Sequence, residues 1–285
     1  MADVSLVVDS RDKLGEGPCW SPREGRLYWF DIKGARLNWF EPAGGASGGH
    51  DLPMRASAAA PLAAGGLLLA SERGLAFFDP RSGTAELRQP MDLGPGFRSN
   101  DGVLLGDGAF WWSSMDDDGG KRPGRIFRTT PDGFTEPVID GIHIANSLGM
   151  TPDRKRLYLA DTKVSTIWAY DPADLAKREV IVSTKGQKGG PDGSAVDAEG
   201  YLWNAHWGEW KVYRYAPDGR VDRVVEMPVE QPSCCCFGGP DRATLFVTSA
   251  WEDLSDEARA KQPQAGSLFA FEPGVRGMEL PLFAY

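Results

Sequence analysis

Residues 157–160 read Leu-Tyr-Leu-Ala, and a segment of this character recurs at regular intervals along the chain. Successive segments begin 40, 43, 47, 45 and 43 residues apart. The six segments are Leu27–Phe30, Leu67–Ala70, Phe110–Ser113, Leu157–Ala160, Leu202–Ala205 and Leu245–Thr248. Each is followed by a second segment that ends in proline, for example Trp-Ala-Tyr-Asp-Pro at 168–172. A period of this length with several short strands per unit is typical of a β-propeller.

The repeat therefore predicts an all-β fold over residues 1–285, a single six-bladed β-propeller domain with four antiparallel strands per blade. An open β-sandwich or two separate β-domains are the alternatives, and the similar spacings favour the propeller. A ring of blades must be closed, and we expect the isolated segment Val4–Val8 to join the last blade. Only residues 255–262 resemble a helix, with Ser255 as its N-cap.

Charge and composition limit the classes of partner. The chain carries 31 Lys and Arg against 40 Asp and Glu, and this acidic balance disfavours nucleic acids and anionic membranes as ligands. Its longest uncharged run, residues 56–71, is too short for a membrane-spanning helix and is interrupted by Pro61. The beginning of the chain does not resemble a signal peptide. The four cysteines, Cys19 and residues 234–236, do not suggest a disulfide framework, so we expect a cytoplasmic protein.

The repeat also brings distant polar residues together. One position lies ten or eleven residues before each recurring segment and precedes the innermost strand of its blade. The residues at this position are Glu16, Ser57, Asn100, Asn146, Asp192 and Cys234. Because the innermost strands of a propeller run parallel to one another, we expect these residues to form a ring at one mouth of the channel.

Four of the six ring residues carry oxygen ligands, and two of these four are carboxylates. Two unpaired carboxylates in a recessed site are costly unless a cation compensates them. The set suits one divalent cation such as Ca²⁺, Mg²⁺ or Mn²⁺, and Zn²⁺ and Fe²⁺ are further options. Asn and Asp are also common turn residues, so each alone would indicate only a turn. The ring favours Glu16, Asn146 and Asp192 as metal ligands.

Five motifs spread over essentially the whole chain resemble those of the SMP-30/gluconolactonase/regucalcin family. They are Leu-Gly-Glu-Gly-Pro at 14–18, Arg-Ser-Asn-Asp-Gly at 98–102, the segment around Asn146, Gly-Pro-Asp-Gly at 190–193 and Cys-Phe-Gly-Gly-Pro-Asp at 236–241. The resemblance implies a six-bladed propeller that binds one divalent metal at the channel mouth and hydrolyses sugar lactones. It implies the same three metal ligands, Glu16, Asn146 and Asp192.

The resemblance also implies that Arg98 and Asn100 contact the substrate. Family members commonly have Arg-Pro-Asn at this place, so Ser99 removes a constraint on the loop. The family's carboxylate after the second strand of blade three matches one of residues 116–118, and spacing favours Asp118. The alternative role for Arg98 is a surface salt bridge.

Hydrolysis of a lactone, which is an ester, requires an activated water and stabilisation of an oxyanion. Asp192 is the predicted general base, and Arg98 and Asn100 are predicted to orient hydroxyl groups or to stabilise charge on oxygen. A bound cation can polarise the carbonyl. The predicted partner is therefore a small-molecule sugar lactone. Two alternatives remain, a broader esterase or organophosphate hydrolase and a non-catalytic propeller that binds calcium or a partner.

Two connections between second and third strands, residues 116–123 and 251–263, are longer than the others. Strand alternation places both at the mouth that carries the ring, so we expect them to cover it. Candidates for an apolar wall, or for simple packing between blades, are Met115, Trp207 and Trp251. We interpret His206 and Cys234 as structural.

Overall fold

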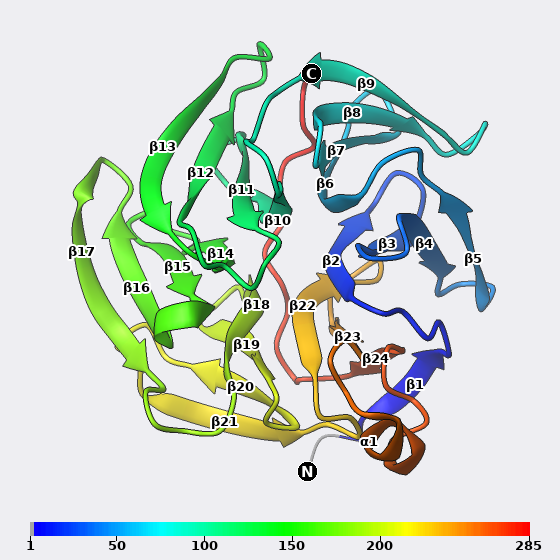
Figure 1. The fold of residues 1–285 in the computed structure, drawn as a ribbon, viewed down its shortest axis with the longest axis vertical. Helices are drawn as coiled ribbons and strands as arrows, with labels where there is room; N and C mark the ends of the chain where they lie inside the picture. The colour runs from blue at the N-terminus through cyan, green and yellow to red at the C-terminus, as the bar shows by residue number, and fades with distance from the viewer. Residues whose placement is uncertain (1–2) are drawn as a thin grey trace.

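The computed structural model describes residues 3–285 and arranges their strands as six blades around a central channel (Figure 1). Each blade is a four-stranded antiparallel sheet, so the predicted all-β, six-bladed propeller is confirmed. The open sandwich and the pair of β-domains are excluded. In this part of the chain, no helix has the length and apolar character needed to cross a membrane.

The first five blades each consist of four consecutive strands, counted from the channel outward. Blade one comprises β2 (Gly15–Ser21), β3 (Arg26–Asp31), β4 (Arg36–Glu41) and β5 (Ala46–Asp51). Blade two comprises β6 (Ala56–Pro61), β7 (Leu67–Ser71), β8 (Gly74–Asp79) and β9 (Thr84–Pro90). Blade three comprises β10 (Phe97–Leu104), β11 (Phe110–Asp116), β12 (Gly124–Thr129) and β13 (Thr135–Ile142).

Blade four comprises β14 (Ala145–Met150), β15 (Leu157–Asp161), β16 (Thr166–Asp171) and β17 (Asp174–Ser183), with the 3₁₀ turn η1 (Thr162–Val164) after β15. Blade five comprises β18 (Gly190–Val196), β19 (Leu202–Trp207), β20 (Lys211–Tyr215) and β21 (Val221–Glu226). Blade six comprises β22 (Pro232–Gly238), β23 (Thr244–Ser249), β24 (Leu268–Phe271) and, as its outer strand, β1 (Ser5–Val8).

Strand β1 closes the ring. It pairs antiparallel with β24, where Ser5 lies opposite Ala270 and Leu6 opposite Phe269. The predicted closing strand is therefore confirmed, and it joins residues 5–8 to the last blade. Between β23 and β24 lies the helix α1 (Asp256–Lys261), whose N-cap Ser255 accepts a hydrogen bond from the backbone N–H of Ala258 at 3.1 Å.

The position of a strand within its blade explains its sequence. Second strands are covered on both faces by neighbouring blades, and β7 is accordingly buried at every position. Outer strands have one face in solvent, and β9 alternates between exposed and half-buried residues. The recurring segments recognised in the sequence are these buried second strands, which is why they are the most apolar part of each repeat.

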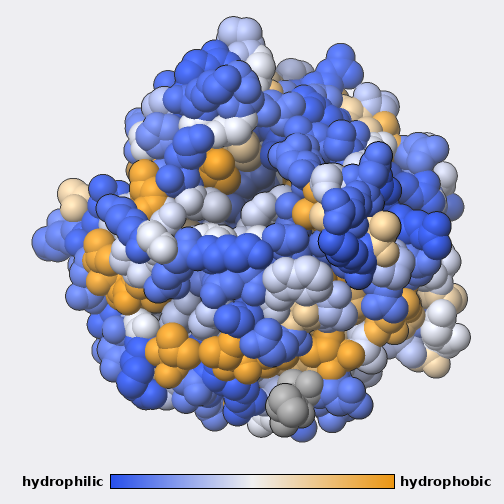
Figure 2. Space-filling view, turned by 60° about the horizontal axis from the view of Figure 1, so that its bottom comes forward, coloured by the Kyte–Doolittle hydropathy of each residue, from blue (hydrophilic) through white to orange (hydrophobic). Residues whose placement is uncertain are grey.

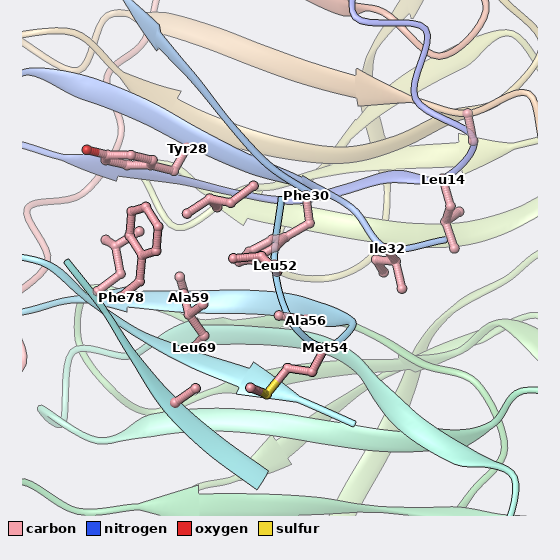
Figure 3. Packing of buried hydrophobic residues seen from close by; sticks show 14 residues of the cluster. Leu14, Tyr28, Phe30, Ile32, Leu52, Met54, Ala56, Ala59, Leu69 and Phe78 are labelled. Atoms are coloured by element: carbon pink, nitrogen blue, oxygen red, sulfur yellow. The ribbon is translucent and has the colours of Figure 1, made fainter. Parts of the chain in front are cut away.

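Neighbouring blades share an apolar layer. Between blades one and two, Tyr28 and Phe30 approach Ala59, Leu69 and Phe78, and all five are buried (Figure 3). Full burial of a side chain such as Phe30 contributes about 1.5–3 kcal/mol. Packing of this kind between blades fixes where each innermost strand lies around the channel.

The two mouths of the channel differ. Glu16 and Asp192 lie near the beginnings of β2 and β18, whereas the ends of the innermost strands meet the C-terminal segment. Asp197, just after β18, pairs with Gly277, and Leu62, just after β6, pairs with Phe283. This segment, red in Figure 1, runs across the centre of the ring. The ring of polar residues therefore lies at the mouth opposite the C-terminal segment.

Candidate functional site

A β-bulge occurs in the innermost strand of every blade at the predicted ring position. Pairing with the second strand is interrupted between Glu16 and Cys19 in β2, and between Pro191 and Ser194 in β18. The other four innermost strands show the same shift. A bulge bends its strand and turns a side chain away from the regular alternation. The repeated irregularity therefore directs the ring residues toward the channel.

Two glycines allow the innermost strands to approach one another beside the acidic residues. Gly17 follows Glu16 with φ 55°, and a Cβ there would lie 1.9 Å from the carbonyl oxygen of Ser57. Gly193 follows Asp192, and a Cβ there would lie 2.2 Å from the Sγ atom of Cys234. Both positions thus require glycine for close approach, and Gly17 also requires it for its left-handed conformation.

Four of the six ring residues line a cavity of about 160 Å³ at this mouth, and Ser57 and Cys234 are not among its lining residues. Its lining residues are Leu14, Glu16, Arg98, Asn100, Met115, Ile144, Asn146, Thr162, Asp192, Trp207 and Glu252. The structure thus brings together both predicted carboxylates, Asn146 and the pair Arg98 and Asn100. The space-filling view shows a hollow in the ring among mainly hydrophilic residues (Figure 2).

Three buried carboxyl groups give the cavity an unusual electrostatic character. Burial raises the pKa of Glu16 to about 8, and the nearby charge of Asp101 adds to this effect. Burial also raises the pKa of Asp192 well above its usual range, with further contributions from Glu16 and Asp101. Burial raises the pKa of Asp101 to about 6, although the N–H groups of Leu148 and Gly102 donate to it at 3.0 and 2.8 Å. The site therefore needs protons or a cation to balance its charge.

The donor set fits a divalent cation. Glu16 and Asp192 are buried, and within residues 3–285 neither carboxylate forms a salt bridge. In this part of the chain no group of three or more His, Cys, Asp or Glu side chains could hold a metal, so the predicted set depends on Asn146 for its third ligand. The Oδ1 atom of Asn146 accepts one hydrogen bond, from Asn100 Nδ2 at 3.2 Å, and a carbonyl oxygen has a second lone pair. Carboxylate and amide oxygens are hard ligands that suit such ions.

A chain of hydrogen bonds runs through the polar side of the cavity. The Nη1 atom of Arg98 donates to Oδ1 of Asn100 at 2.7 Å, and Nδ2 of Asn100 donates to Oδ1 of Asn146. The Nδ2 atom of Asn146 donates to Oγ1 of Thr162 at 2.8 Å, and this hydroxyl donates to the carbonyl of Pro191 at 2.7 Å. The chain links blades three, four and five and fixes the orientation of both amides.

Two polar residues that the repeat pattern does not identify hold Asp192 in place. The carbonyl oxygen of Asp192 accepts hydrogen bonds from Ser147 Oγ at 2.5 Å and from Asn204 Nδ2 at 2.8 Å. Asn204 also donates to Oγ of Ser194 at 2.8 Å, so its amide spans the bulge of β18. An asparagine in the middle of a buried second strand was the available signal, because apolar residues usually occupy such positions.

Hydrogen bonds orient the side chain of Arg98. Ser99 follows it where the family's proline would restrict the backbone. Arg98 is 5% exposed, and its Nη1 atom also donates to the carbonyl of Ser99 at 2.9 Å. The Ser99 hydroxyl donates to the carbonyl of Ala70 at 3.0 Å and accepts from Ser57 at 2.7 Å. The ring residue Ser57 thus supports the loop below Arg98, and Arg98 is no surface residue.

The three consecutive aspartates after β11 have different surroundings. Asp118, which spacing favours, is exposed and pairs with Lys121 at 2.7 Å. Asp116 is buried and accepts from Arg122 Nη2 at 2.7 Å. Asp117 accepts from Nε of Arg98 at 2.7 Å. The structure thus places Asp117, rather than Asp118, beside the predicted substrate-contacting residues.

The remaining candidates divide between the cavity and the blades. Met115 and Trp207 line the cavity, whereas Trp251 packs beside Arg259 and donates Nε1 to the carbonyl of Arg11 at 3.0 Å. His206 is fully buried and bonds to Glu209 and Tyr215, each at 2.9 Å. Burial raises the pKa of the Cys234 thiol well above its usual range, which disfavours a thiolate nucleophile. These observations support the structural interpretation of His206 and Cys234.

Both long connections lie at the mouth of the cavity, as predicted. Asp116, at the start of the first one, pairs with Phe97 at the beginning of β10. Ser249, just before the second one, pairs with Pro232 at the beginning of β22. The two connections meet at Lys33, which lies 2.9 Å from Asp117 and 3.3 Å from Glu252.

Fold and site together define a class: six-bladed propellers with an acidic, oxygen-rich site at one mouth of the channel. Residues 14–251 match the family model described as SMP-30/Gluconolactonase/LRE-like region. The chain therefore belongs to the SMP-30/gluconolactonase family, as its motifs indicate.

Known proteins of this kind align along the whole chain. The L-arabinolactonase of Azospirillum brasilense is 37% identical over 99% of this chain and 95% of its own length. The pentonolactonase XacC of Haloferax volcanii is 33% identical over 96% of each chain. The crystal structure of a calcium-binding protein, regucalcin, from Agrobacterium tumefaciens has a TM-score of 0.93 at 36% identity, covering 99% of this chain and 97% of that chain.

Proposed function

We propose that the protein is a metal-dependent hydrolase that opens five- or six-carbon sugar lactones to the corresponding sugar acids. The observation that carries this proposal is that Glu16, Asn146 and Asp192 converge with Arg98 and Asn100, all of them buried, in one cavity at the channel mouth. The relatives named L-arabinolactonase and pentonolactonase support a lactone as substrate. We further propose that the enzyme acts in the cytoplasm on this small molecule, without a nucleic-acid or membrane partner.

Glu16, Asn146 and Asp192 would hold the cation. The two carboxylates would neutralise a divalent ion, which removes the electrostatic cost of burying them together. When bound, such a cation polarises the lactone carbonyl and lowers the barrier to attack. Hard oxygen ligands favour Ca²⁺, Mg²⁺ or Mn²⁺, with Zn²⁺ and Fe²⁺ as further options. The similarity to a calcium-binding protein supports Ca²⁺ as one of these.

Asp192 is the proposed general base. Its backbone is fixed by Ser147 and Asn204, so the carboxylate can face the cavity in a constant orientation. It would take a proton from the attacking water while the water oxygen bonds to the lactone carbonyl carbon. The ring C–O bond then breaks, and the ring oxygen receives the proton from Asp192. The product is a hydroxy acid.

Arg98 and Asn100 are the proposed substrate-binding groups. Hydrogen bonds to Asp117, Ser99 and Asn100 occupy the Nε and Nη1 atoms of Arg98. Within residues 3–285, its Nη2 atom has no protein hydrogen-bond partner, so two N–H donors remain for sugar oxygens. Met115 and Trp207 would cover the apolar face of the sugar ring.

A second candidate function is non-catalytic calcium binding, which the similarity to the calcium-binding regucalcin favours. A panel of five- and six-carbon aldonolactones, assayed with metal, with chelator and after metal is restored, separates the two functions. We expect turnover that chelator abolishes and metal restores, after correction for spontaneous opening at alkaline pH. No turnover of any lactone, with Ca²⁺ still raising the melting temperature, would establish the non-catalytic function. Aryl ester and organophosphate substrates in the same panel test the broader hydrolase.

A further inference from the structure

One carboxylate of the first long connection is surrounded by cations from three blades. Asp117 accepts from Lys33 Nζ at 2.9 Å, from Arg55 Nη1 at 2.8 Å and from Arg98 Nε at 2.7 Å. Lys33 follows β3 of blade one, Arg55 precedes β6 of blade two, and Arg98 lies on β10 of blade three. Asp117 thus joins three blades at the mouth of the cavity.

The cations around Asp117 are balanced by carboxylates. Lys33 also pairs with Glu252 at 3.3 Å, and Arg55 pairs with Glu72 at 2.7 Å. Three cations therefore face three carboxylates, and this cluster carries no excess positive charge. Burial tends to raise the pKa of Asp117, but hydrogen bonds from Lys33, Arg55 and Arg98 outweigh it and hold the pKa well below its usual range. Asp117 is therefore ionised at neutral pH.

The connection is held independently at its other positions. The carboxylate of Asp116 accepts from the backbone N–H of Arg122 at 3.1 Å, besides its ion pair with the Arg122 guanidinium. The Nζ atom of Lys163 donates to the carbonyl of Gly119 at 2.9 Å. A Cβ at Gly120 would lie 2.5 Å from Cγ1 of Ile144, so the connection packs against a residue that lines the cavity. Removal of the Asp117 charge thus leaves the connection with other anchors.

We propose that Asp117 is a positioning residue that aims the free Nη2 group of Arg98 into the cavity and neutralises its charge, and that Lys33 and Arg55 hold Asp117 there. The inference rests on the proposed lactone hydrolysis and specifies its substrate class. An arginine paired with Asp117 offers N–H donors without net charge, which suits the hydroxyl and carbonyl oxygens of an uncharged lactone. Within this cluster, Lys33, Arg55 and Arg98 are all paired with carboxylates, so none of the three is left for a carboxylate, phosphate or sulfonate group on the substrate.

The test compares Asp117→Asn with wild type on D-gluconolactone and on D-glucaro-1,4-lactone, which carries an additional carboxylate. We expect KM for the neutral lactone to rise roughly tenfold or more, because a charged hydrogen bond to Arg98 is lost, with a smaller change in kcat. We expect the ratio of kcat/KM for the anionic over the neutral lactone to rise, because Arg98 gains an uncompensated charge. Asp117→Glu keeps the charge and should restore part of the neutral-lactone KM.

Two further variants make the result decisive. Asp140→Asn is the matched control, because Asp140 is an exposed carboxylate on the same blade that pairs with Arg125 at 2.9 Å, and it should leave both substrates unchanged. Asp118→Asn tests the neighbouring carboxylate that spacing favours. A rise in KM with Asp118→Asn and none with Asp117→Asn would overturn the proposal, as would an Asp117→Asn variant with an unchanged preference between the two lactones.

Hydrogen exchange tests whether Lys33 and Arg55 hold Asp117 without depending on lactone hydrolysis. The backbone amide of residue 117, which donates to the carbonyl of Gly96 at 2.9 Å, should exchange at least about tenfold faster in Asp117→Asn, in Lys33→Met and in Arg55→Met than in wild type. This readout requires no turnover. A wild-type protein that opens no lactone would refute the proposed function, while unchanged exchange in all three variants would refute the role of Lys33 and Arg55 in holding Asp117.

Discussion

Asp192 is proposed to act both as a metal ligand and as the general base, and one substitution separates these two roles. An amide oxygen can still coordinate a metal, but an amide cannot accept a proton from water as a carboxylate does. We therefore expect Asp192→Asn to lose roughly 10²- to 10⁴-fold in kcat, the usual magnitude of general base catalysis. Steady-state kinetics at saturating metal measure this loss without a contribution from weaker metal binding.

The control for this experiment is a substitution of Glu16, the other carboxylate of the site. Glu16→Gln removes one anionic ligand and should weaken metal binding, yet it should recover most of its kcat once metal is saturating. A metal-saturated Asp192→Asn enzyme with kcat near wild type would exclude Asp192 as the base. Asp118, in the connection above the cavity, would then be the next candidate.

Asn204 provides a second residue-scale prediction. Its Nδ2 atom donates to the carbonyl of Asp192 and to the hydroxyls of Ser147 and Ser194. Asn204→Leu leaves these buried groups unsatisfied, which costs about 1–3 kcal/mol of stability. Because the bulge that carries Asp192 loses its support, metal affinity should fall as well. Calorimetric titration with metal and urea unfolding measure the two effects.

Asn38→Leu is the matched control for Asn204→Leu. Asn38 is also a buried asparagine, and its Nδ2 atom donates to Asp12 at 2.9 Å in blade one, away from the cavity lining. It should lower stability by a similar amount and leave metal affinity unchanged. Equal metal affinity in both variants would assign Asn204 a purely structural role.

At the scale of elements, the bulges in the innermost strands depend on close contact between blades. Gly193 of β18 lies against Cys234 of β22, and an added Cβ would meet the Sγ atom at 2.2 Å. We expect Gly193→Ala to cost about 1–3 kcal/mol, because an added Cβ would also lie 2.8 Å from the Cα atom of Cys234, so rotation of the thiol alone cannot relieve the contact. Metal affinity should fall too, since Asp192 is the adjacent residue. Thermal unfolding with and without metal measures both effects.

Gly44→Ala is the appropriate comparison for Gly193→Ala. Gly44 lies between β4 and β5, and its nearest neighbour to an added Cβ is the flexible Glu41 side chain at 3.4 Å. This substitution should change stability by only a few tenths of a kcal/mol. A Gly193→Ala protein that is as stable as Gly44→Ala would show that the innermost strands can move apart.

The sequence predicted those elements whose signal is repeated and local. The buried second strands are apolar in every unit, so their spacing predicted the blades, and position within the repeat predicted that Glu16, Asn146 and Asp192 meet. The position of the Asp117 side chain could not be predicted in this way. It is fixed by Lys33 and Arg55, which lie 84 and 62 residues away in sequence and come from different blades. Spacing within one connection carries no information about such partners.

At the scale of the whole molecule, the site joins parts of the ring that are otherwise held by packing between neighbouring blades. Glu16 belongs to blade one, Asn146 to blade four and Asp192 to blade five. Blade one is also the neighbour of the seam at blade six, where β1 completes the ring. A cation held by all three residues would therefore connect blades that do not all share a direct interface.

Metal binding should change the stability of the whole ring in a way that depends on pH. Without a cation, the pKa of Glu16 is raised to about 8 and that of Asp192 is raised as well, so the folded protein binds more protons than the unfolded chain. The stability of the metal-free protein should therefore fall as pH rises from about 4.5, the usual pKa of Glu16, to about 8. A cation removes this repulsion, so its effect on the melting temperature should be larger at pH 8 than at pH 6. Metal at 100 times its dissociation constant should add about 2.7 kcal/mol.

Differential scanning calorimetry of metal-free and metal-loaded protein at the two pH values measures this difference. Glu16→Gln removes one of the coupled carboxyl groups, so its metal-free form should depend less on pH and its response to metal should be smaller. An ion that stabilises wild type and Glu16→Gln equally at both pH values would bind elsewhere on the propeller. An ion that stabilises wild type more than Glu16→Gln, and more at pH 8, would bind where the three blades converge, because only there does its binding compete with protons on Glu16 and Asp192.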